Sequence, residues 1–543
     1  MAGRIIACAA LALCASFGHA SEQEAKKAYD QKQYPQAAAL YLQEFDKVRE
    51  ASLLYNAACS FALAGERDLA LDALSRALEH GWLNADATAR DTDFDSLRSD
   101  PRWPKLIEAM KNRQVLEGRL YDSPAIGTAF AENLSEDEKI AGLSKLWSEV
   151  KYNFVYVETL KQLDWDKLYV EYLPKVRATR STLEYYRVLT ELIGRLQDGH
   201  SNVVPPDQLR DRMWARPLMR TRPVEGRVFV DQVFSPSLQA LGIAPGLEVT
   251  AVDGVPVAEY MRRDVAPYQS ASTPQDMEQR THGYGFLAGD VAQVPKVTFV
   301  GKSGKPFTVD VPRATMAEAA KAVTPRPPFE LKMLPGGVAY VALNGFGDQR
   351  AADAFIAAFP QIRQARALVI DVRANGGGNS DVGYRVLATL TAKPFLTTKW
   401  ATREYHPTFR AWGRAPKMYQ SDAGERPADG ERLFTGPVAV LTSGATYSAA
   451  EDFALAFDTM KRGPIIGEPT GGSTGQPLFF SLPGGGRARV CTKQDLYADG
   501  RKFVGVGIQP SILVRPTVAD LRKNKDTVLN AALAYVSATL RSK

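Results

Sequence analysis

The sequence predicts a multidomain protein: a helical N-terminal module, a second helical segment, a β-rich domain and a C-terminal α/β core. Two versions of one helical pattern lie within residues 22–112. Short apolar strand patterns dominate residues 206–320, and from about Phe329 strand and helix patterns alternate. The length of 543 residues implies roughly three to four domains, which agrees with this division.

The first twenty residues have the features of a segment that is removed during export. Arg4 gives a positive start, residues 5–15 form an apolar run, and Gly18–Ala20 is a small-residue cleavage site. The apolar run is too short to span a bilayer. We therefore expect residues 1–20 to be a signal peptide and the mature protein to be exported, periplasmic or secreted, with no transmembrane segment.

Composition excludes several classes of function. The apolar content of 45% and charged content of 24% are those of an ordinary soluble globular protein. The net charge of +6 is small and the basic residues are dispersed, so we expect no nucleic-acid partner. No ligand cluster or phosphate loop appears, so no metal or nucleotide cofactor is implied. Cys59 and Cys491 lie in separate apolar stretches, which predicts two buried free thiols.

Residues 21–112 repeat one helical theme. Residues 25–41 and 54–74 each contain a small-and-aromatic helix, a polar or glycine turn and a second helix. The pattern resembles tetratricopeptide repeats, whose helix pairs stack because neither helix buries its apolar face alone. The resemblance implies either recognition of a protein partner or packing on the same chain. Residues 113–135 are predicted to be a linker.

Helical patterns return in residues 136–205 and include a segment, 185–197, that ends at Asp198–Ser201. Residues 206–325 are predicted to form a β domain. Its expected strands are residues 227–233, 247–252 and 296–300. Residues 241–257 resemble the core of a PDZ domain, in which glycines make tight turns around a strand and a short hairpin.

Residues 326–543 are predicted to form an α/β core with a C-terminal helix. The expected strands and helices, in order, are strand 337–343, helix 350–363, strand 367–372, strand 436–441, a helix after Ser448, and a closing helix at 525–540. Strand 367–372 is apolar except for Asp371, as expected of a strand buried on both faces.

Ser448 lies between the strand at 436–441 and a helical pattern in which Ala450, Phe453 and Phe457 share one face. At a helix N-terminus, unpaired backbone N–H groups and the helix dipole favour a developing negative charge. Acyl transfer needs a nucleophile in such a place, because the oxyanion forms beside it. Alone, the pattern also fits an N-cap serine.

Three segments resemble one family when taken together. They are residues 196–201, residues 370–379, and residues 446–451 followed by 466–472. In this order, around a PDZ-like insert, they resemble the serine peptidases that include the C-terminal processing (tail-specific) proteases, the tricorn core and the interphotoreceptor retinoid-binding proteins. The resemblance implies a crotonase-like sheet with helices as the peptidase core, and hydrolysis through an acyl-enzyme.

In this resemblance Ser448 falls on the nucleophile. The tail-specific branch has a lysine base at the position of Ser473, so this chain lacks that dyad. The tricorn-like branch uses a histidine from the upstream helical segment, and His200 matches it. A neutral imidazole can take the serine proton and return it to the leaving group, which predicts a pH–rate limb at roughly 6–7.5. His406 is the competing histidine.

The glycines after strand 367–372 are expected on the other side of the site. In the family this turn supplies one oxyanion donor, here Gly376 or Gly377, and the amide after the nucleophile, here Ala449, supplies the other. Asp371 and Arg373 are predicted to be a structural pair that holds the turn.

The acid that completes the relay in tricorn-like members is replaced here by Val504. Either another residue orients His200, with Asp198, Glu468 and Asp499 as the possible third members, or the third member is absent. Loss of the orienting acid weakens general-base catalysis without abolishing it.

These observations together predict an exported serine endopeptidase that cleaves peptides or unfolded proteins through an acyl-enzyme on Ser448, with His200 as general base. Two alternatives stay open. One is a catalytically weak peptide- or lipid-binding protein of the same fold, and the other is an esterase that uses the same residues.

Overall fold

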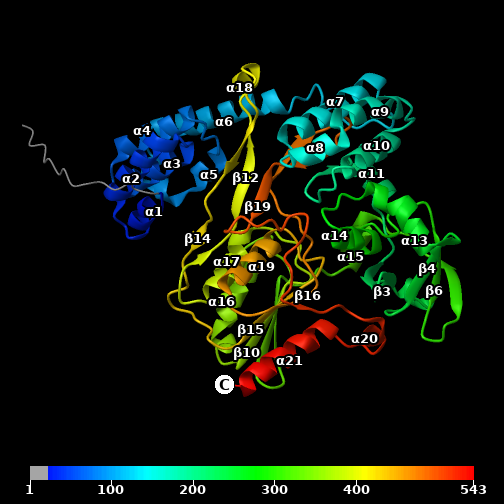
Figure 1. The fold of residues 1–543 in the computed structure, drawn as a ribbon. Coiled ribbons are helices and arrows are strands. Elements are labelled where there is room, and N and C mark those ends of the chain that lie inside the picture. The colour runs from blue at the N-terminus through cyan, green and yellow to red at the C-terminus, as the bar shows by residue number, and fades with distance from the viewer. Residues whose placement is uncertain (1–21, 543) are drawn as a thin grey trace, which may run out of the picture. The chain divides into compact units, whose positions relative to one another are not determined.

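A computed structural model describes residues 22–542, which form two compact units divided between Pro124 and Ala125 (Figure 1). The predicted signal peptide at residues 1–20 lies outside the described residues. Within residues 22–542, no helix has both the length and the apolar character needed to cross a membrane.

The first unit is helical, as the sequence predicts. Its elements are α1 (Glu22–Asp30), α2 (Tyr34–Val48), α3 (Ala51–Leu63), α4 (Arg67–Glu79), α5 (Ala85–Arg90), the 3₁₀ helix η1 (Thr92–Leu97) and α6 (Arg102–Tyr121). Consecutive helices approach closely because small residues such as Ala57 and Ala58 are fully buried between them. The helical prediction is confirmed, whereas the tetratricopeptide resemblance stays a prediction.

The predicted linker at 113–135 begins later than expected, because α6 continues through residues 113–121. These residues are mostly good helix formers, and Arg113 pairs with Glu117 one turn later, with N and O 2.8 Å apart. Irregular chain begins at Asp122 and lasts until the capping box of Ser135 and Glu138 starts the next helix.

The second unit begins with four helices. They are α7 (Glu136–Asn153), α8 (Val157–Leu163), α9 (Trp165–Arg177) and α10 (Thr182–Gly194). They share an apolar core with the distant hairpin of β17 (Pro477–Ser481) and β18 (Arg487–Cys491). Residues 202–204, predicted as part of the helical segment, instead form strand β1 (Asn202–Val204), because Val203 is buried where β1 pairs antiparallel with β18. This pairing holds residues 198–201 against the C-terminal core.

The β domain contains an antiparallel sheet in the order β2-β3-β4-β6-β7, with β5 paired to β4. Its strands are β2 (Met219–Val224), β3 (Arg227–Val233), β4 (Glu248–Val252), β5 (Val255–Pro256), β6 (Lys296–Val300) and β7 (Pro306–Asp310). Its helical elements are α11 (Asp207–Met213), α12 (Pro236–Ala240), α13 (Val257–Tyr260), η2 (Met261–Val265), η3 (Ala266–Tyr268), α14 (Pro274–Gln279), η4 (Arg280–Tyr284) and α15 (Met316–Ala322). The three predicted strands are confirmed, and the PDZ resemblance stays a prediction.

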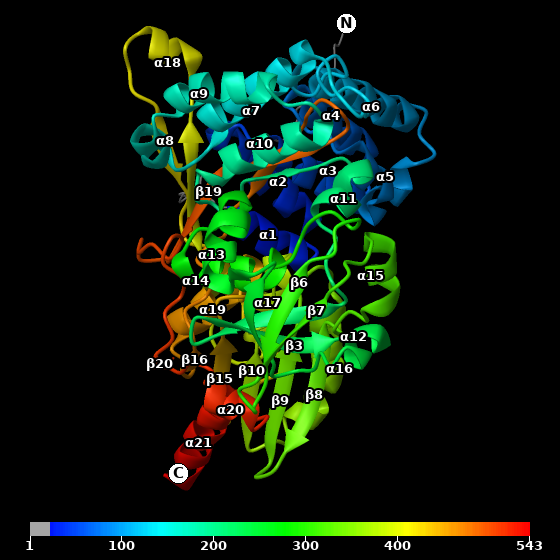
Figure 2. The same cartoon turned by 90° about the vertical axis from the view of Figure 1, so that its right-hand side faces the viewer.

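The core is built on a six-stranded sheet in the order β20-β16-β15-β10-β9-β8 (Figure 2). The strands are β8 (Phe329–Leu334), β9 (Val338–Leu343), β10 (Ala367–Asp371), β15 (Val438–Thr442), β16 (Ile465–Gly467) and β20 (Ile512–Leu513). All neighbours run parallel except β8, which is antiparallel to β9. Every residue of β10 and β15 is buried, as expected of parallel strands covered on both faces.

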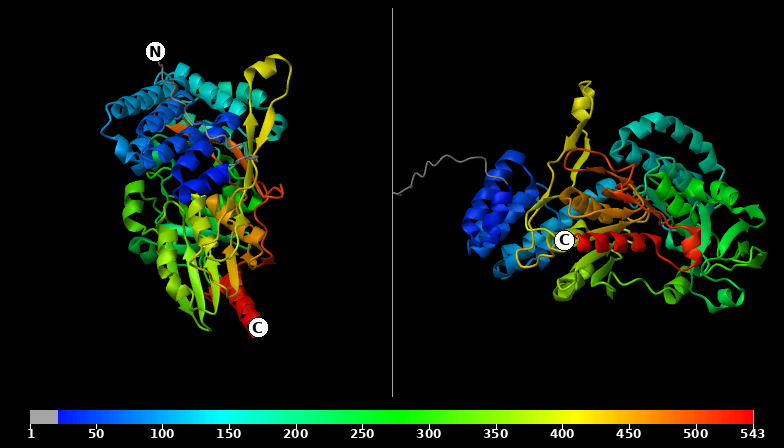
Figure 3. Two further views of the ribbon diagram at one scale, coloured as in Figure 1. Left: turned by 90° about the vertical axis from the view of Figure 1, so that its left-hand side faces the viewer. Right: turned by 60° about the horizontal axis from the view of Figure 1, so that its bottom comes forward.

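Helices cover both faces of this sheet. One face packs against α16 (Arg350–Ile362), α17 (Ser380–Ala388) and α19 (Ala449–Met460), and the other packs against α21 (Thr527–Arg541), which follows α20 (Val518–Arg522) (Figure 3). The remaining elements are β11 (Phe395–Leu396), β12 (Lys399–Glu404), α18 (Pro407–Ala411), β13 (Lys417–Gln420), β14 (Glu425–Arg426) and β19 (Lys493–Leu496). The carboxyl ends of β10, β15 and β16 meet at one sheet edge, where binding loops of parallel sheets gather.

A protein lacking residues 1–124 should be soluble and should melt close to the transition that the second unit shows in the full-length protein. The reason is that residues 125–543 contain complete apolar cores of their own. Calorimetry and size-exclusion chromatography measure this. Aggregation of the truncated protein would show that the second unit depends on the first.

Candidate active site

Ser448 lies in a tight turn between β15 and α19. Two hydroxyls hold the turn to the end of β10: Ser443 Oγ donates to the carbonyl of Arg373 at 2.8 Å, and Thr446 Oγ1 to that of Val372 at 2.9 Å. The backbone of Ser448 has φ 55° and ψ −127°, which is unusual for a residue with a side chain. Such a strained strand-to-helix turn presents a nucleophilic hydroxyl at a helix N-terminus.

His200 lies within hydrogen-bond distance of this hydroxyl. Its Nε2 is 3.2 Å from Ser448 Oγ, although 248 positions separate the two residues. The imidazole is only 5% exposed and stacks on the ring of Tyr447, with ring centroids 5.3 Å apart and planes 11° apart. The preceding Gly199 permits this approach, because a Cβ there would overlap the Tyr447 hydroxyl. The structure therefore brings Ser448 and His200 together.

Ser473 occupies the other side of the imidazole. His200 Nδ1 is 2.9 Å from Ser473 Oγ, and Ser473 is fully buried. When Nε2 accepts the Ser448 proton, Nδ1 carries the hydrogen and the Ser473 hydroxyl accepts from it. The sequence does not single out Ser473, because the family resemblance marks position 473 only as the place of a lysine base. The signal for it is a hydroxyl at the position of that base.

Glu451 connects the nucleophile to the loop that carries Ser473. One carboxylate oxygen accepts from Thr470 Oγ1 at 2.5 Å and from the Gly472 N–H at 2.7 Å. The other accepts from the backbone N–H groups of Ser473 at 2.8 Å and Ser448 at 3.2 Å. Burial raises the pKa of Glu451 to about 7, and the four hydrogen bonds oppose this rise by favouring the carboxylate.

Asp198, a possible third member, is buried two residues before His200. Its Oδ2 accepts from the Ser201 hydroxyl at 2.5 Å, and burial raises the pKa of Asp198 to about 6. Ser201 Oγ also accepts from the Cys491 N–H at 3.0 Å. These bonds fasten the His200 turn to β18, which is a supporting contact rather than one to the imidazole.

The other two possible third members lie in different surroundings. Glu468 lines a separate hollow, and Asp499 pairs with the neighbouring Arg501 at 2.7 Å. Val504 packs against the apolar core. Within residues 22–542, the hydrogen-bond partners of the His200 ring are the two serine hydroxyls and no carboxylate.

Two backbone amides near Ser448 have no acceptor within the described part of the chain. They belong to Gly376 and Ala449, whereas the Gly377 N–H donates to Asn375 Oδ1 at 2.9 Å. Gly377 has φ 96°, and a Cβ there would lie 2.7 Å from the Cβ of Ser448. Gly377 therefore permits the close approach of the two turns, and Gly376 offers the open N–H.

The other described histidines have partners in their own segments. His406 is exposed and its Nε2 lies 3.0 Å from a carboxylate oxygen of Glu404. His80 and His282 contact backbone carbonyls four residues earlier in their helices. Among the described residues, His200 is the histidine whose ring bonds to Ser448.

Two further structural predictions are confirmed. Arg373 pairs with Asp371 at 2.6 Å and also with Asp526 at 2.7 Å, which ties the glycine turn to the start of α21. Cys59 and Cys491 are both buried and free.

The electrostatics of the site favour a neutral imidazole. Burial lowers the pKa of His200 to about 3, and the positive charges of Arg489, Arg280 and Lys493 lower it further. His200 is therefore available as a base over the whole neutral range. A protonated His200 would have no carboxylate partner among the described residues, so this site stabilises an imidazolium less than one with an aspartate would.

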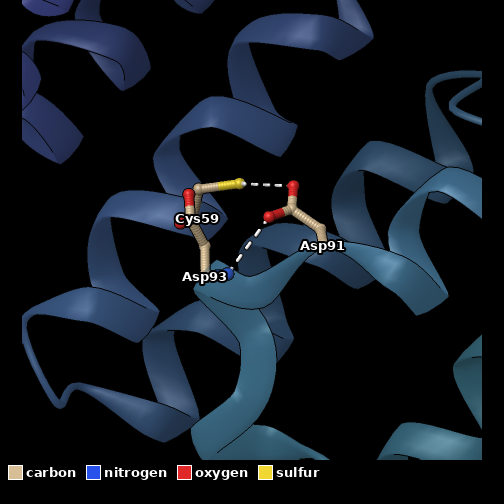
Figure 4. A group of neighbouring side chains, drawn as sticks. All are labelled: Cys59, Asp91 and Asp93. Atoms are coloured by element: carbon tan, nitrogen blue, oxygen red, sulfur yellow. Dashed lines mark hydrogen bonds between the residues drawn. The ribbon is translucent and has the colours of Figure 1, made fainter.

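A separate group of possible metal ligands lies in the first unit: Cys59, Asp91 and Asp93 (Figure 4). The Cys59 Sγ is 3.9 Å from Asp91 Oδ2. Tyr55 donates its hydroxyl to Asp91 and Tyr29 donates to Asp93, while burial raises the pKa of the Cys59 thiol far above its usual range. Metal binding needs a thiolate and free carboxylate lone pairs, so this group fits a hydrogen-bonded cluster better than a metal centre.

Gly377→Ala should lower kcat/KM by about a hundredfold or more, because its Cβ would displace Ser448 and the amide of Ala449. Gly376→Ala is the matched control, since a Cβ there meets nothing within 4 Å and the N–H is kept. The rate of labelling by a small fluorophosphonate measures both variants without a bulky substrate. Equal rates in the two variants would contradict this description of the turn.

Comparisons with known proteins agree with the order of these segments. Residues 337–514 match the model of Peptidase family S41, and residues 139–194 match that of the Tricorn protease C1 domain. The fold is similar to that of mature CPAF complexed with lactacystin (14% identity, 75% of this chain and 98% of that chain covered, TM-score 0.58) and to a second structure of mature CPAF (15%, 75%, 96%, 0.58). The photosystem II D1 C-terminal processing protease is also similar (20% identity, 70% and 93% covered, TM-score 0.42). Residues 337–514 therefore have the character of peptidase family S41, and the chain is a serine peptidase.

Proposed function

We propose that this serine peptidase is an exported endopeptidase that cleaves peptides or unfolded proteins through an acyl-enzyme on Ser448, with His200 as general base. The observation that carries the proposal is the 3.2 Å approach of His200 Nε2 to Ser448 Oγ. Export is proposed from the character of residues 1–20, and the helical repeats of residues 21–112 are proposed to recruit a protein partner.

The first half of the reaction uses a hydroxyl, an imidazole and two backbone amides. Ser448 Oγ attacks the substrate carbonyl carbon while His200 Nε2 accepts the hydroxyl proton. The carbonyl oxygen becomes an oxyanion and receives hydrogen bonds from the amides of Gly376 and Ala449. As the carbon–nitrogen bond breaks, His200 gives its proton to the leaving amine and the acyl group remains on Ser448.

The second half repeats these steps with water. His200 Nε2 takes a proton from a water molecule, whose oxygen attacks the acyl carbon and forms a second oxyanion at the same amides. When this intermediate collapses, the acid product leaves and the proton returns from His200 to Ser448 Oγ. No charge remains on the site at the end of the cycle.

Ser473 is proposed as a positioning residue in place of the missing acid. Its hydroxyl fixes the tautomer and orientation of His200 through Nδ1, and Glu451 holds the Ser473 backbone in turn. A hydroxyl orients the ring but carries no negative charge, so it supplies only part of what an aspartate supplies.

A catalytically weak peptide- or lipid-binding protein is the second candidate function. It is favoured by one observation: within residues 22–542 the ring of His200 bonds to two serine hydroxyls and to no carboxylate. An esterase using the same residues is the third, because esters have better leaving groups than amides. Turnover of casein compared with that of a short ester separates the peptidase from both.

Ser448→Ala should abolish both hydrolysis and fluorophosphonate labelling while leaving the fold intact, because the loss of a serine at a helix start costs at most ~1–2 kcal/mol. Mass spectrometry of the labelled wild-type protein should locate the adduct on Ser448. Ser443→Ala is the control, since that hydroxyl donates to the Arg373 carbonyl and not to His200. Activity retained by a folded Ser448→Ala protein would exclude this nucleophile.

Ser473→Ala should lower kcat by about tenfold to a hundredfold with little change in KM, because His200 loses the acceptor of its Nδ1 hydrogen. Thr474→Val is the matched control, since the buried Thr474 hydroxyl has no hydrogen-bond partner. An unchanged kcat in Ser473→Ala would contradict the positioning role.

The pH profile is a second readout of the same variants. A base is active when deprotonated, so a lowered pKa of about 3 for His200 moves the acid limb of kcat/KM well below pH 6.5 in the wild type. In Ser473→Ala the acid limb of kcat/KM should not move to higher pH, because the loss of this hydroxyl gives the buried imidazolium of His200 no new partner. A wild-type limb near pH 7 would instead assign the titration to Glu451, whose pKa burial raises to about 7.

A further inference from the structure

A hollow of about 870 Å³ lies between the β domain and the sheet of the core. Residues of β2 and η4 line one side, and residues of β8, β9 and β10 line the other. Ser448 and His200 are not among its lining residues, although Ser443 and Ala445 of the same turn are. Its size is in the range of pockets that hold ligands of several chemical groups.

Three arginines of this hollow have no carboxylate partner within residues 22–542. Arg216 donates to the backbone carbonyl of Tyr284 at 2.6 Å, and Arg220 donates to Gln232 Oε1 at 3.1 Å. Arg326 is exposed and forms no ion pair. The guanidinium groups of these three arginines can therefore still donate charge-assisted hydrogen bonds to an anion.

The acidic residues of the hollow do not supply that anion. Most are paired with cations beside them: Asp231 with Arg222, Glu330 with Lys332, and both Asp371 and Asp526 with Arg373. Glu468 is the remaining carboxylate, and burial raises its pKa, which favours its neutral form. The unmatched charge of the hollow is therefore positive and comes from Arg216, Arg220 and Arg326.

The guanidinium groups of the hollow repel one another. Burial lowers the pKa of Arg220, and repulsion from Arg326 lowers it further, while attraction from Asp231 opposes part of this shift. The pKa of Arg216 is also lowered, by removal of its guanidinium from water and then by repulsion from Arg220. Arginine keeps its charge under such conditions, so the repulsion is relieved when an anion binds rather than by loss of a proton.

The hollow is continuous with the turn that carries the nucleophile. Ser443 and Ala445 line it, together with Gln279 of α14, which packs against the same turn beside Gly444. Three residues of chain span at most about 11 Å, so Ala445 lies within that reach of Ser448. An extended peptide that passes the nucleophile can therefore enter the hollow within a few residues of the scissile bond.

We propose that this hollow binds acidic side chains of the peptide substrate through Arg216, Arg220 and Arg326, and so makes the enzyme selective for acidic segments near the cleavage site. The inference rests on the proposed peptidase function and deepens it by naming the substrate class. Bidentate guanidinium–carboxylate hydrogen bonds would provide both the attraction and the geometric selectivity.

Two peptides of equal length test the proposal, one with a cluster of Glu and Asp several positions from the scissile bond and one with Gln and Asn in their place. Both are acetylated and amidated, so terminal charges do not contribute. The wild-type enzyme should cleave the acidic peptide with a kcat/KM about tenfold higher, mainly through KM, and added salt should reduce this preference. Equal kcat/KM values for the two peptides would overturn the proposal.

The double variant Arg220→Gln/Arg326→Gln should lose the preference and keep its turnover of the neutral peptide. Arg262→Gln is the matched control, because Arg262 is an exposed arginine of the β domain outside the hollow. Arg326→Glu alone, at an exposed position, should weaken the preference and guards against misfolding of the double variant. Preference retained in both folded variants would overturn the proposal.

A binding measurement separates this inference from the proposed function. Fluorescence anisotropy of the labelled acidic peptide with the Ser448→Ala protein needs no catalysis, and binding should weaken about tenfold for the Gln and Asn peptide. Tight binding of the acidic peptide without cleavage by the wild type would remove the peptidase proposal and keep the site. Cleavage of both peptides without any difference in binding would keep the peptidase and remove the site.

Discussion

The fully buried carboxylate of Glu451 is the constraint on which the catalytic arrangement depends. Its two oxygens accept four hydrogen bonds, from the nucleophile's own backbone and from the loop that contains Ser473. Together with the bond from the Ser448 N–H to the Ser473 carbonyl at 3.2 Å, they hold the strained backbone of Ser448 in register with the residue that contacts His200 Nδ1. A single acidic side chain on the first turn of α19 thus positions both partners of the imidazole.

The third participant, His200, reaches the site through tertiary pairing. The chain passes from α10 into β1, and β1 pairs with β18 of the C-terminal region, while the four helices pack on the β17–β18 hairpin. The position of His200 is therefore fixed by contacts across almost 300 positions of sequence. Burial and the neighbouring cations lower the pKa of His200, so the site favours the uncharged imidazole and stabilises the imidazolium only weakly.

Local signals predicted most of the core. A few consecutive residues are enough to predict the strands β10 and β15, because both are apolar runs. The same holds for the turn of small residues before α19. His200 was found through a resemblance, because no local feature distinguishes it from a histidine at a helix end. The contact of Ser473 with His200 joins loops 273 positions apart, so the sequence offers only one sign of it, a hydroxyl at the position of the lysine base. The bond from the Gly377 N–H to Asn375 Oδ1 is local, within a single turn. The extension of α6 was missed because its polar residues carry little periodicity.

The backbone of Ser448 has a consequence for the evolution of this fold. A side chain held at φ 55° and ψ −127° costs of order 1–3 kcal/mol, and a glycine at the same position would be relaxed. The nucleophile is therefore kept against the direction of greater stability, and the hydrogen bonds of Glu451 offset that cost. Selection for a larger free energy of unfolding alone would replace Ser448 before it changed the residues of the sheet. A relative that kept this fold only for binding would therefore be expected to lose the serine at this position first.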